Sequence, residues 1–231
     1  MEEYLSRYRA LSTPVVFDVL DRMGHPNCAL NAAIRGLHPS MTVVGPAFTI
    51  SGESVDDGTD YGAAAFEMYR RIVPGSVLVM AGQGHRIAGP WGENATLSAQ
   101  LAGARGLVTD TGTRDATAII ERGFPTFVRY VSPVFMSGRF AITGHQRPIA
   151  LAGQVEPTVT VNPGDFVVAD CDGVVIVPQS LIDTVLEAAE ELERIEVRIR
   201  TALQSGEDRE SVYSRLPKYA HIPRPSRQRD G

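Results

Sequence analysis

Short apolar runs alternate with helical segments through the middle of the chain. Residues 77–80 and 106–109 are continuous runs of apolar, Gly or β-branched residues, a pattern typical of strands buried on both faces of a sheet, and residues 126–130, rich in β-branched and aromatic residues, predict a further strand. Residues 94–105, rich in Ala and Leu, and residues 116–122 separate these runs and predict helices. The order strand, helix, strand, helix, strand is a βαβαβ signature, so we predict an α/β fold with a parallel sheet.

Shorter strands are predicted on either side of this unit. Residues 41–44 and 47–50 are β-rich runs divided by Gly45-Pro46, which predicts two strands with a turn or bulge between them. A β-meander is expected after residue 132, with strands at residues 141–143, 159–161, 166–169 and 174–177. The last two would form a hairpin through Asp170-Cys171-Asp172-Gly173. We interpret this string as a turn because the later acid of a calcium loop is missing.

Helices are predicted near both ends of the chain. Ser12-Thr13-Pro14 favours a helix start, and the helix over residues 15–23 would end at Gly24. Apolar residues at helical spacing predict a long helix over residues 181–203, followed by a short helix that reaches Leu216. Further helices are expected over residues 1–9 and 62–72.

Length and composition indicate how these elements are organised. A chain of 231 residues with 43% hydrophobic content can bury a large core, and we predict one compact domain over residues 1–216. Residues 217–231 contain three prolines and many charges. They predict a flexible tail or an arm on a partner subunit.

Charge and cysteine content exclude several classes of protein. The formal net charge is −5, and no stretch before residue 217 clusters Lys and Arg, which argues against a nucleic-acid-binding surface. Cys28 and Cys171 are too few for a disulfide framework, and the acidic, amphipathic N-terminus is unlike a signal peptide. No apolar run approaches the ~20 residues that span a bilayer. We expect a cytoplasmic protein with no membrane and no nucleic-acid partner.

The candidate chemistry lies in two loops of the βαβαβ unit. The first loop is rich in glycine (Gly82, Gly84, Gly89, Gly92) and ends at Glu93, before a predicted helix. The amides of Asn94 and Ala95 would lie free at the positive end of that helix, where a carboxylate binds favourably. The loop also contains His85 and Arg86, which either contact substrate or are simply exposed. The chain has no G-x-S-x-G, P-loop, G-x-G-x-x-G or His-pair metal motif.

The second loop ends in Arg114-Asp115. Arg114 can make a forked contact with an anion, and Asp115 and Glu93 offer the hard oxygen ligands that Mg²⁺ or Mn²⁺ prefers. Each residue also has an ordinary structural reading. Glu93 would complement the helix dipole, Asp115 would cap the helix that starts near Ala116, and Arg114 would lie in solvent. Together they favour a site for a small anion beside a metal.

Four strings are distinctive: Glu93 followed by twenty residues and Arg114-Asp115, the segment LAGARGLVTD, the string PVF at residues 133–135, and PGDFVVADCDGVVIVP over residues 163–178. They resemble the RraA-like family, which includes class II pyruvate aldolases acting on 4-hydroxy-4-methyl-2-oxoglutarate. The resemblance covers roughly residues 12 to 200. The chain departs from the characterised aldolases at Glu93, where they have Asp, and in TDTGTRD, where a DGAVRD-like string is usual.

The resemblance implies a swivelling β/β/α domain with flanking N- and C-terminal helices, assembled as homotrimers or homohexamers with sites between subunits. It implies that Asp115 binds Mg²⁺ or Mn²⁺ directly, with waters filling most of the metal's shell, and that Glu93 orients a metal-bound water. Arg114, with Gly92 and the amides of Asn94 and Ala95, would hold a 2-oxo acid substrate.

These positions allow three functional hypotheses. The first is a metal-dependent pyruvate aldolase that cleaves 4-hydroxy-2-oxo acids and also decarboxylates oxaloacetate, because both reactions share one enolate. The second is a non-enzymatic regulator that binds RNase E. Such a regulator resembles this chain but has Gly at the position of Glu93. The third is a family member with another 2-oxo or sugar-acid substrate.

Overall fold

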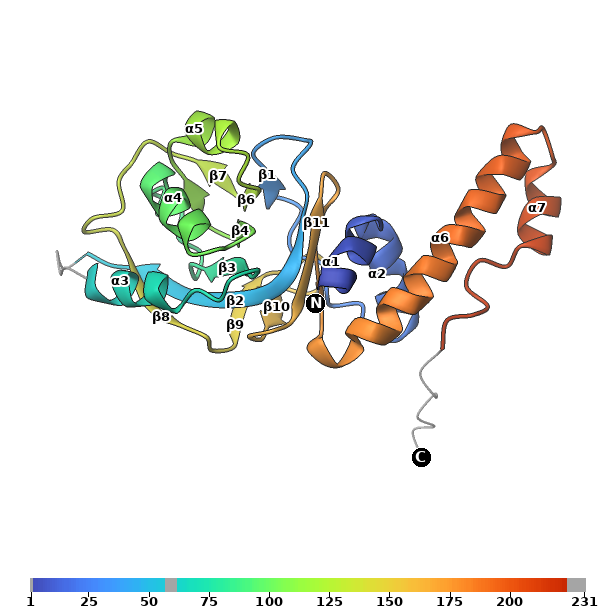
Figure 1. The fold of residues 1–231 in the computed structure, drawn as a ribbon, viewed down its shortest axis with the longest axis horizontal. Helices are drawn as coiled ribbons and strands as arrows, with labels where there is room; N and C mark the ends of the chain where they lie inside the picture. The colour runs from blue at the N-terminus through green and yellow to red at the C-terminus, as the bar shows by residue number, and fades with distance from the viewer. Residues whose placement is uncertain (1, 57–61, 224–231) are drawn as a thin grey trace.

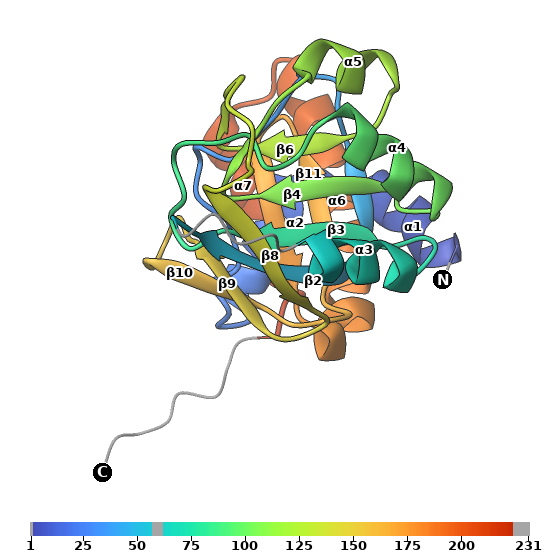
Figure 2. The same cartoon turned by 90° about the vertical axis from the view of Figure 1, so that its left-hand side faces the viewer.

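The computed structural model describes residues 2–56 and 62–223. Its centre is an eight-stranded sheet in the order β1, β6, β4, β3, β2, β11, β12, with β8 also paired to β2. These strands are β1 (Arg35–Gly36), β2 (Val43–Ser54), β3 (Val77–Ala81), β4 (Gly106–Thr109), β6 (Thr126–Val128), β8 (Phe140–His145), β11 (Phe166–Asp170) and β12 (Gly173–Val177). The sheet curls towards a nearly closed barrel (Figure 2).

The predicted βαβαβ unit is present. Strands β2, β3, β4 and β6 lie side by side and run parallel. Every residue of β3, β4 and β6 is buried, which agrees with their continuous apolar sequences. The connecting helices are α4 (Glu93–Leu101) and α5 (Ala116–Glu121). The α/β fold class predicted from the sequence is therefore confirmed.

Strand β2 corrects the prediction of two strands divided at Gly45-Pro46. It is one continuous strand of twelve residues. Ala47 donates its amide to Asp165 O on the β11 side, so the amide position of Pro46 faces the opposite edge. Pairing with β3 begins on that edge only at Ala47. The missing N–H of Pro46 therefore removes no hydrogen bond from the sheet, and the strand continues.

Helices cover both sides of the sheet (Figure 1). One layer contains α1 (Glu2–Arg9), α2 (Thr13–Arg22) and α6 (Ile182–Gln204), which share a buried cluster with β11 and β12. The other contains α3 (Gly62–Arg71), α4 and α5, packed on β2, β3 and β4. A third apolar cluster fills the interior between the main sheet and the hairpin of β9 (Ile149–Ala152) and β10 (Thr158–Val161). No helix of the described residues could cross a membrane.

The end of α4 and the presence of β9 are among the details that differ from the sequence prediction. Helix α4 ends at Leu101 and not at Arg105, because Gly103 adopts φ +85° and the Ala104 amide bonds back to Ala99 O at 2.9 Å. Strand β9 was not predicted. It is a four-residue strand directly after Pro148, with too few residues to establish an alternating pattern.

The hairpin predicted at residues 170–173 is present between β11 and β12. Asp170 and Asp172 belong to an acidic cluster with Cys171, but the Asp170 carboxylate already has protein donors. It accepts hydrogen bonds from the Thr13 amide at 2.8 Å, the Thr13 hydroxyl at 2.6 Å and the Asp172 amide at 2.9 Å. The carboxylate therefore attaches the start of α2 to the hairpin, as a turn residue would.

The C-terminal segment begins after helix α7 (Arg209–Arg215), which packs on the outer half of α6 (Figure 1). Residues 217–223, the first part of the predicted tail or subunit arm, contact the rest of the domain. Lys218 pairs with Glu196 at 2.8 Å, the Tyr219 hydroxyl donates to Asp18 at 2.6 Å, and Ile222 is buried. Residues 224–231 lie outside the described residues, and for them the flexible tail or subunit arm stays a prediction.

Candidate functional site

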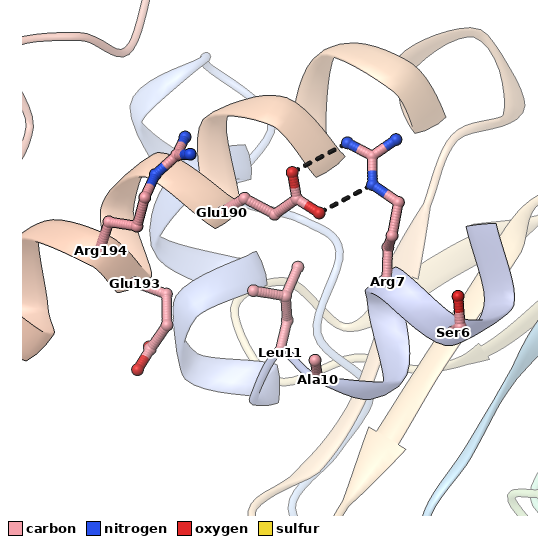
Figure 3. A pocket seen from close by; sticks show the side chains of 7 residues that line it. All are labelled: Ser6, Arg7, Ala10, Leu11, Glu190, Glu193 and Arg194. Carbon is pink, nitrogen blue, oxygen red and sulfur yellow. Dashed lines mark hydrogen bonds and ion pairs between the residues drawn. The ribbon is translucent and has the colours of Figure 1, made fainter. Parts of the chain in front are cut away.

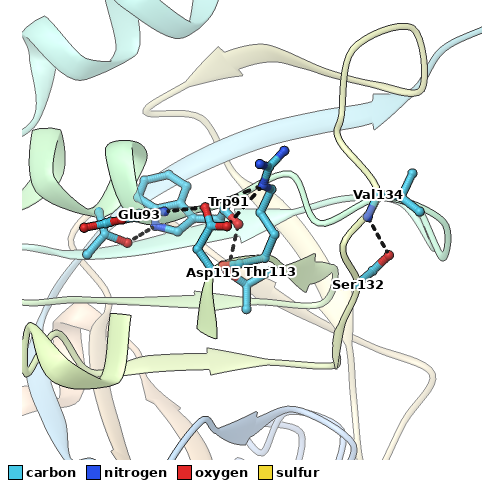
Figure 4. A network of polar contacts seen from close by, with 8 residues as sticks. Trp91, Glu93, Thr113, Asp115, Ser132 and Val134 are labelled. Atoms are coloured by element: carbon cyan, nitrogen blue, oxygen red, sulfur yellow. Dashed lines mark hydrogen bonds and ion pairs between the residues drawn. The ribbon is translucent and has the colours of Figure 1, made fainter. Parts of the chain in front are cut away.

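Two loops leave the sheet side by side. Strand β3 leads through residues 82–92 to α4, and β4 leads through β5 (Gly112–Thr113) to α5. Because the strands are parallel neighbours, both loops emerge at the same edge of the sheet. Trp91 O accepts bonds from the Arg114 amide and the Thr113 hydroxyl, each at 2.8 Å (Figure 4). The backbone thus joins the two predicted halves of the site.

Two glycines of the first loop allow this close approach. A Cβ at Gly89 would lie 2.6 Å from the Thr113 carbonyl carbon. A Cβ at Gly92 would lie 2.7 Å from Asp115 Oδ2 and 3.0 Å from Arg114 Cγ. Real Cβ atoms do not approach other atoms so closely, so any side chain at Gly92 would displace the Asp115 carboxylate. The glycine-rich composition here serves contact between the loops.

Asp115 has an uncommon backbone conformation, with φ +58° and ψ +34°. It occupies the N-cap position of α5, yet its side chain accepts no bond from that helix. Its Oδ2 atom instead accepts the amide of Glu93, the first residue of α4, at 3.1 Å (Figure 4). A left-handed conformation in a residue other than Gly costs on the order of 1 to 3 kcal/mol. The simple capping role is therefore wrong, and the strained residue directs its carboxylate towards the other loop.

Arg114 lies between Asp115 and an exposed aromatic ring. Its Nε is 3.5 Å from both carboxylate oxygens of Asp115, and its guanidinium lies 5.2 Å from the centroid of the Phe135 ring. Phe135 lies in the segment that follows strand β7 (Tyr130–Val131). Neither Nη atom of Arg114 donates to any residue in the described ranges. Arg114 is thus held in place with most of its donors available.

The first turn of α4 offers two further donors. The Glu93 amide bonds to Asp115, and the Thr96 amide bonds to Gly92 O at 3.0 Å. The amides of Asn94 and Ala95 donate to no other described residue, as expected in the first turn of a helix. Both therefore remain available to an anion beside Asp115 and Arg114.

Glu93 does not direct its carboxylate at Asp115. Its Oε1 accepts bonds from Arg122 Nη2 at 2.6 Å and Arg122 Nε at 3.2 Å. The expectation that Glu93 and Asp115 form a shared pair of metal ligands thus has no support here, although the Glu93 amide donates to the Asp115 carboxylate. Sequence reasoning missed Arg122, whose only signal was a basic residue at the end of α5, directly before Gly123.

His85 is buried, not exposed as one sequence reading had it. The Ala88 amide donates to His85 Nε2 at 2.9 Å, so the proton lies on Nδ1, which donates to the Ser54 hydroxyl at 2.8 Å. Burial lowers the pKa of this imidazole. Both ring nitrogens are used within the fold, so His85 supports the glycine-rich loop and is not a substrate contact. Arg86 remains exposed.

Asp110 forms another support beneath the loops. It is almost fully buried at the end of β4, and its Oδ1 accepts the Gly82 amide at 2.7 Å. Burial raises the pKa of this carboxyl group, partly offset by that hydrogen bond. Asp110 thus holds the start of the first loop against the start of the second.

The site fits a divalent cation that keeps most of its bound water. Asp115 is half-exposed, and although Oδ2 accepts the Glu93 amide, Oδ1 has only a long contact with Arg114 and remains available to a cation. Mg²⁺ commonly keeps several waters and binds proteins through one or two carboxylates. The geometry therefore suits a hydrated ion on Asp115 better than a cage of several protein ligands.

A separate groove of about 560 Å³ lies between α1 and α6 (Figure 3). It contains no residue of the two loops. Arg7 crosses it and donates two hydrogen bonds to Glu190, from Nε to Oε1 and from Nη2 to Oε2, each 2.8 Å long. The charged groups at its centre satisfy one another and leave few donors for a ligand.

Comparisons with known proteins identify the family to which this chain is related. The family model described as RraA-like, Aldolase/RraA, matches residues 13–176. A Halalkalibacterium halodurans protein named "Putative 4-hydroxy-4-methyl-2-oxoglutarate aldolase" is 28% identical over 187 residues, covering 81% of this chain and 82% of its own. An uncharacterized protein from Pseudomonas syringae has a structure with TM-score 0.82 and 29% identity, covering 93% of this chain and 94% of its own.

The structure of Streptomyces coelicolor RraAS2, described as an unusual member of the RNase ES inhibitor RraA protein family, is also similar. Its TM-score is 0.77 at 26% identity, with 86% of this chain and 97% of that chain covered. The relatives thus include a protein named as an aldolase and a member of an inhibitor family. The matched residues contain both loops of the candidate site. This chain belongs to the RraA-like family.

Proposed function

We propose that this protein is a divalent-metal-dependent lyase that cleaves 4-hydroxy-2-oxo acids to pyruvate and also decarboxylates oxaloacetate. The observation that carries the proposal is the position of Asp115. A strained backbone and the absence of a side chain at Gly92 place its carboxylate beside Arg114 and the first turn of α4. A carboxylate, a guanidinium and free helix amides within one small region suit a metal ion and an anionic substrate.

Asp115 would hold Mg²⁺ or Mn²⁺ together with water. When bound, the ion would act as a Lewis acid that polarises the 2-oxo group of the substrate. Arg114 would bind the carboxylate of the 2-oxo acid through its available Nη atoms, and its contact with Phe135 would limit its rotation. Gly92 and the amides of Asn94 and Ala95 would line the same anion site.

Glu93 would accept a hydrogen bond from the water that exchanges a proton with the substrate. In aldol cleavage the 4-hydroxyl group loses a proton, the C3–C4 bond breaks, and the electron pair moves towards the 2-oxo group before C3 is protonated. In oxaloacetate the bond that breaks releases CO₂, and the remaining fragment is the same. One arrangement of residues therefore serves both reactions.

The H. halodurans relative supports a lyase through its name. We further propose a homotrimer or homohexamer, with sites completed between subunits. Nothing in this assignment depends on a nucleic-acid or membrane partner.

A second candidate function is regulation without catalysis. The likeness to RraAS2, from an RNase ES inhibitor family, favours it. Glu93 argues for the enzyme, because RNase E regulators that resemble this chain carry Gly there. A family member with another 2-oxo or sugar-acid substrate would use the same residues.

The deciding experiment is a pyruvate-release assay over a panel of 4-hydroxy-2-oxo acids and oxaloacetate, with EDTA and with added Mg²⁺ or Mn²⁺. We expect metal-dependent release, and a fall of about 100-fold or more in Asp115→Ala with the oligomer intact. Asp115→Asn is the matched variant that keeps size and removes charge. Release that is unchanged in Asp115→Ala would reject the metal assignment, and no release from any compound would favour the regulator.

A further inference from the structure

The site contains a second guanidinium, that of Arg122, which contacts Glu93. We infer that Arg122 is a positioning residue that fixes the carboxylate of Glu93 for its role with water. This inference rests on the proposed function, because it assigns a purpose to Glu93 within that reaction. It concerns how Glu93 is held and adds no new contact between protein and substrate.

The geometry of the pair leaves one carboxylate oxygen available. Both donors of Arg122, Nη2 at 2.6 Å and Nε at 3.2 Å, converge on Oε1 of Glu93. Oε2 accepts no hydrogen bond from any residue between 2 and 56 or between 62 and 223. Two donors on one oxygen restrict rotation of the carboxylate while leaving the other oxygen to accept from a water. A parallel pair of bonds, as between Arg7 and Glu190, would have used both oxygens.

Arg122 is itself held at a defined place. It is the C-cap residue of α5, its amide bonds to Ala118 O at 3.0 Å, and Gly123 ends the helix with φ +65°. Its carbonyl oxygen accepts from Gln100 Nε2 of α4 at 3.4 Å. The backbone that carries the guanidinium is thus attached to the helix that carries Glu93.

Both ends of α5 contact Glu93. Asp115, at the N-terminal end, accepts the Glu93 amide, and Arg122, at the C-terminal end, binds the Glu93 carboxylate. The same short helix therefore sets the positions of the proposed metal ligand and of the proposed water acceptor. Glu93 is therefore held through both its amide and its carboxylate, whereas an ordinary surface ion pair holds only the carboxylate.

An ordinary surface ion pair is the alternative. The side chains of Arg122 and Glu93 are 32% and 41% exposed, and pairs with such exposure contribute little to stability. An ordinary pair would therefore affect neither turnover nor stability appreciably when broken. A positioning pair would lower turnover without changing the melting temperature.

The test compares Arg122→Gln, Arg122→Lys and Arg200→Gln. Arg200 is the matched control, because its Nη2 also lies 2.6 Å from a glutamate oxygen, that of Glu193. Both residues belong to α6, which contains no residue of the two loops. We expect Arg122→Gln to lower kcat about 10- to 100-fold, with KM for the 2-oxo acid changed by less than about 3-fold. Arg122→Lys, which keeps the charge, should recover most of kcat, and Arg200→Gln should match the wild type.

A crystal structure of Arg122→Gln gives a readout that does not depend on activity. We expect the Glu93 carboxylate to leave the position seen beside Arg122, while Asp115 keeps its left-handed conformation. An unchanged Glu93 would overturn the inference even if the wild type proved inactive on every compound, a result that would refute the proposed function separately. Unchanged kcat in Arg122→Gln, or a rise in KM alone, would also overturn it.

Discussion

The candidate site and the groove between α1 and α6 each place an arginine beside a carboxylate, and the two pairs differ in how completely their bonds are made. Arg7 and Glu190 form two parallel bonds of 2.8 Å, and Arg7 lowers the pKa of Glu190 (Figure 3). Arg114 and Asp115 approach only to 3.5 Å, and Asp115 adopts a strained backbone. A satisfied pair joins two helices, whereas an incompletely satisfied pair retains donors and acceptors for a ligand.

The volume of the groove is a poor guide to function for the same reason. It is a large hollow, yet its polar groups are engaged with each other. The loop site is identified by strain, close glycine contacts and available donors. This contrast predicts that variants in the two regions affect different measurements.

The largest effect is expected for Gly92→Ala. The new Cβ would meet Asp115 Oδ2 at 2.7 Å, so the carboxylate must move, and a displacement of about 1 Å can cost about 100-fold in rate. Pyruvate release and Mn²⁺ affinity measured by electron paramagnetic resonance should both fall. Gly144→Ala is the control, since its Cβ would meet the flexible Ser51 hydroxyl at 3.0 Å and, apart from its chain neighbours, no other described atom within 4 Å. Equal activity in the two variants would contradict the proposed role of Gly92.

A smaller effect is expected from protonation of His85, whose ring nitrogens are both used beneath the loop. Because burial lowers the pKa of His85, the unfolded chain takes up the proton first as pH falls. The contribution of the neutral His85 ring to folding stability is complete above the ordinary histidine pKa of about 6.5 and decreases as pH falls below that value. Tm measured from pH 8 to pH 5 should fall less steeply in His85→Gln. Parallel curves for the two proteins would remove His85 from this account.

The smallest effect is expected for Arg7→Met in the groove. It should lower Tm slightly and leave pyruvate release unchanged, because both Arg7 and Glu190 are satisfied by each other and lie apart from the loops. Arg7 lowers the pKa of Glu190, so the contribution of the pair is present above the ordinary glutamate value and is lost as pH falls through the lowered value. The difference in Tm between variant and wild type should therefore shrink in acid. A loss of turnover would break the distinction between the two regions.

The sequence predicted the parallel unit and the meeting of its two loops because both follow from local pattern and general topology. Apolar runs identify buried strands, and parallel strands bring their carboxyl ends to one edge. Glycine spacing before Glu93 and the Arg114-Asp115 pair then mark the loops. The continuity of β2 through Pro46 was not predictable, because it depends on which edge of the strand has a partner at that residue.

Other features depend on contacts between residues distant in sequence. Arg122 binds a carboxylate 29 positions away, and His85 is buried through Ser54, 31 positions away. A basic residue at a helix end and a histidine in a glycine-rich loop are both common on protein surfaces. Only the packing of α4 against α5, and of the first loop against β2, gives these two residues their partners.

Helix α5 has only six residues, and its length fixes the position of Arg122 relative to Asp115. Each residue added to an α-helix advances it by about 1.5 Å and turns it by about 100°. A single insertion between Ala116 and Glu121 would therefore swing the guanidinium at its far end to another side while leaving the aspartate at its start unmoved. Substitutions at the exposed positions of α5, Thr117 and Glu121, should be tolerated far more readily than any change in its length.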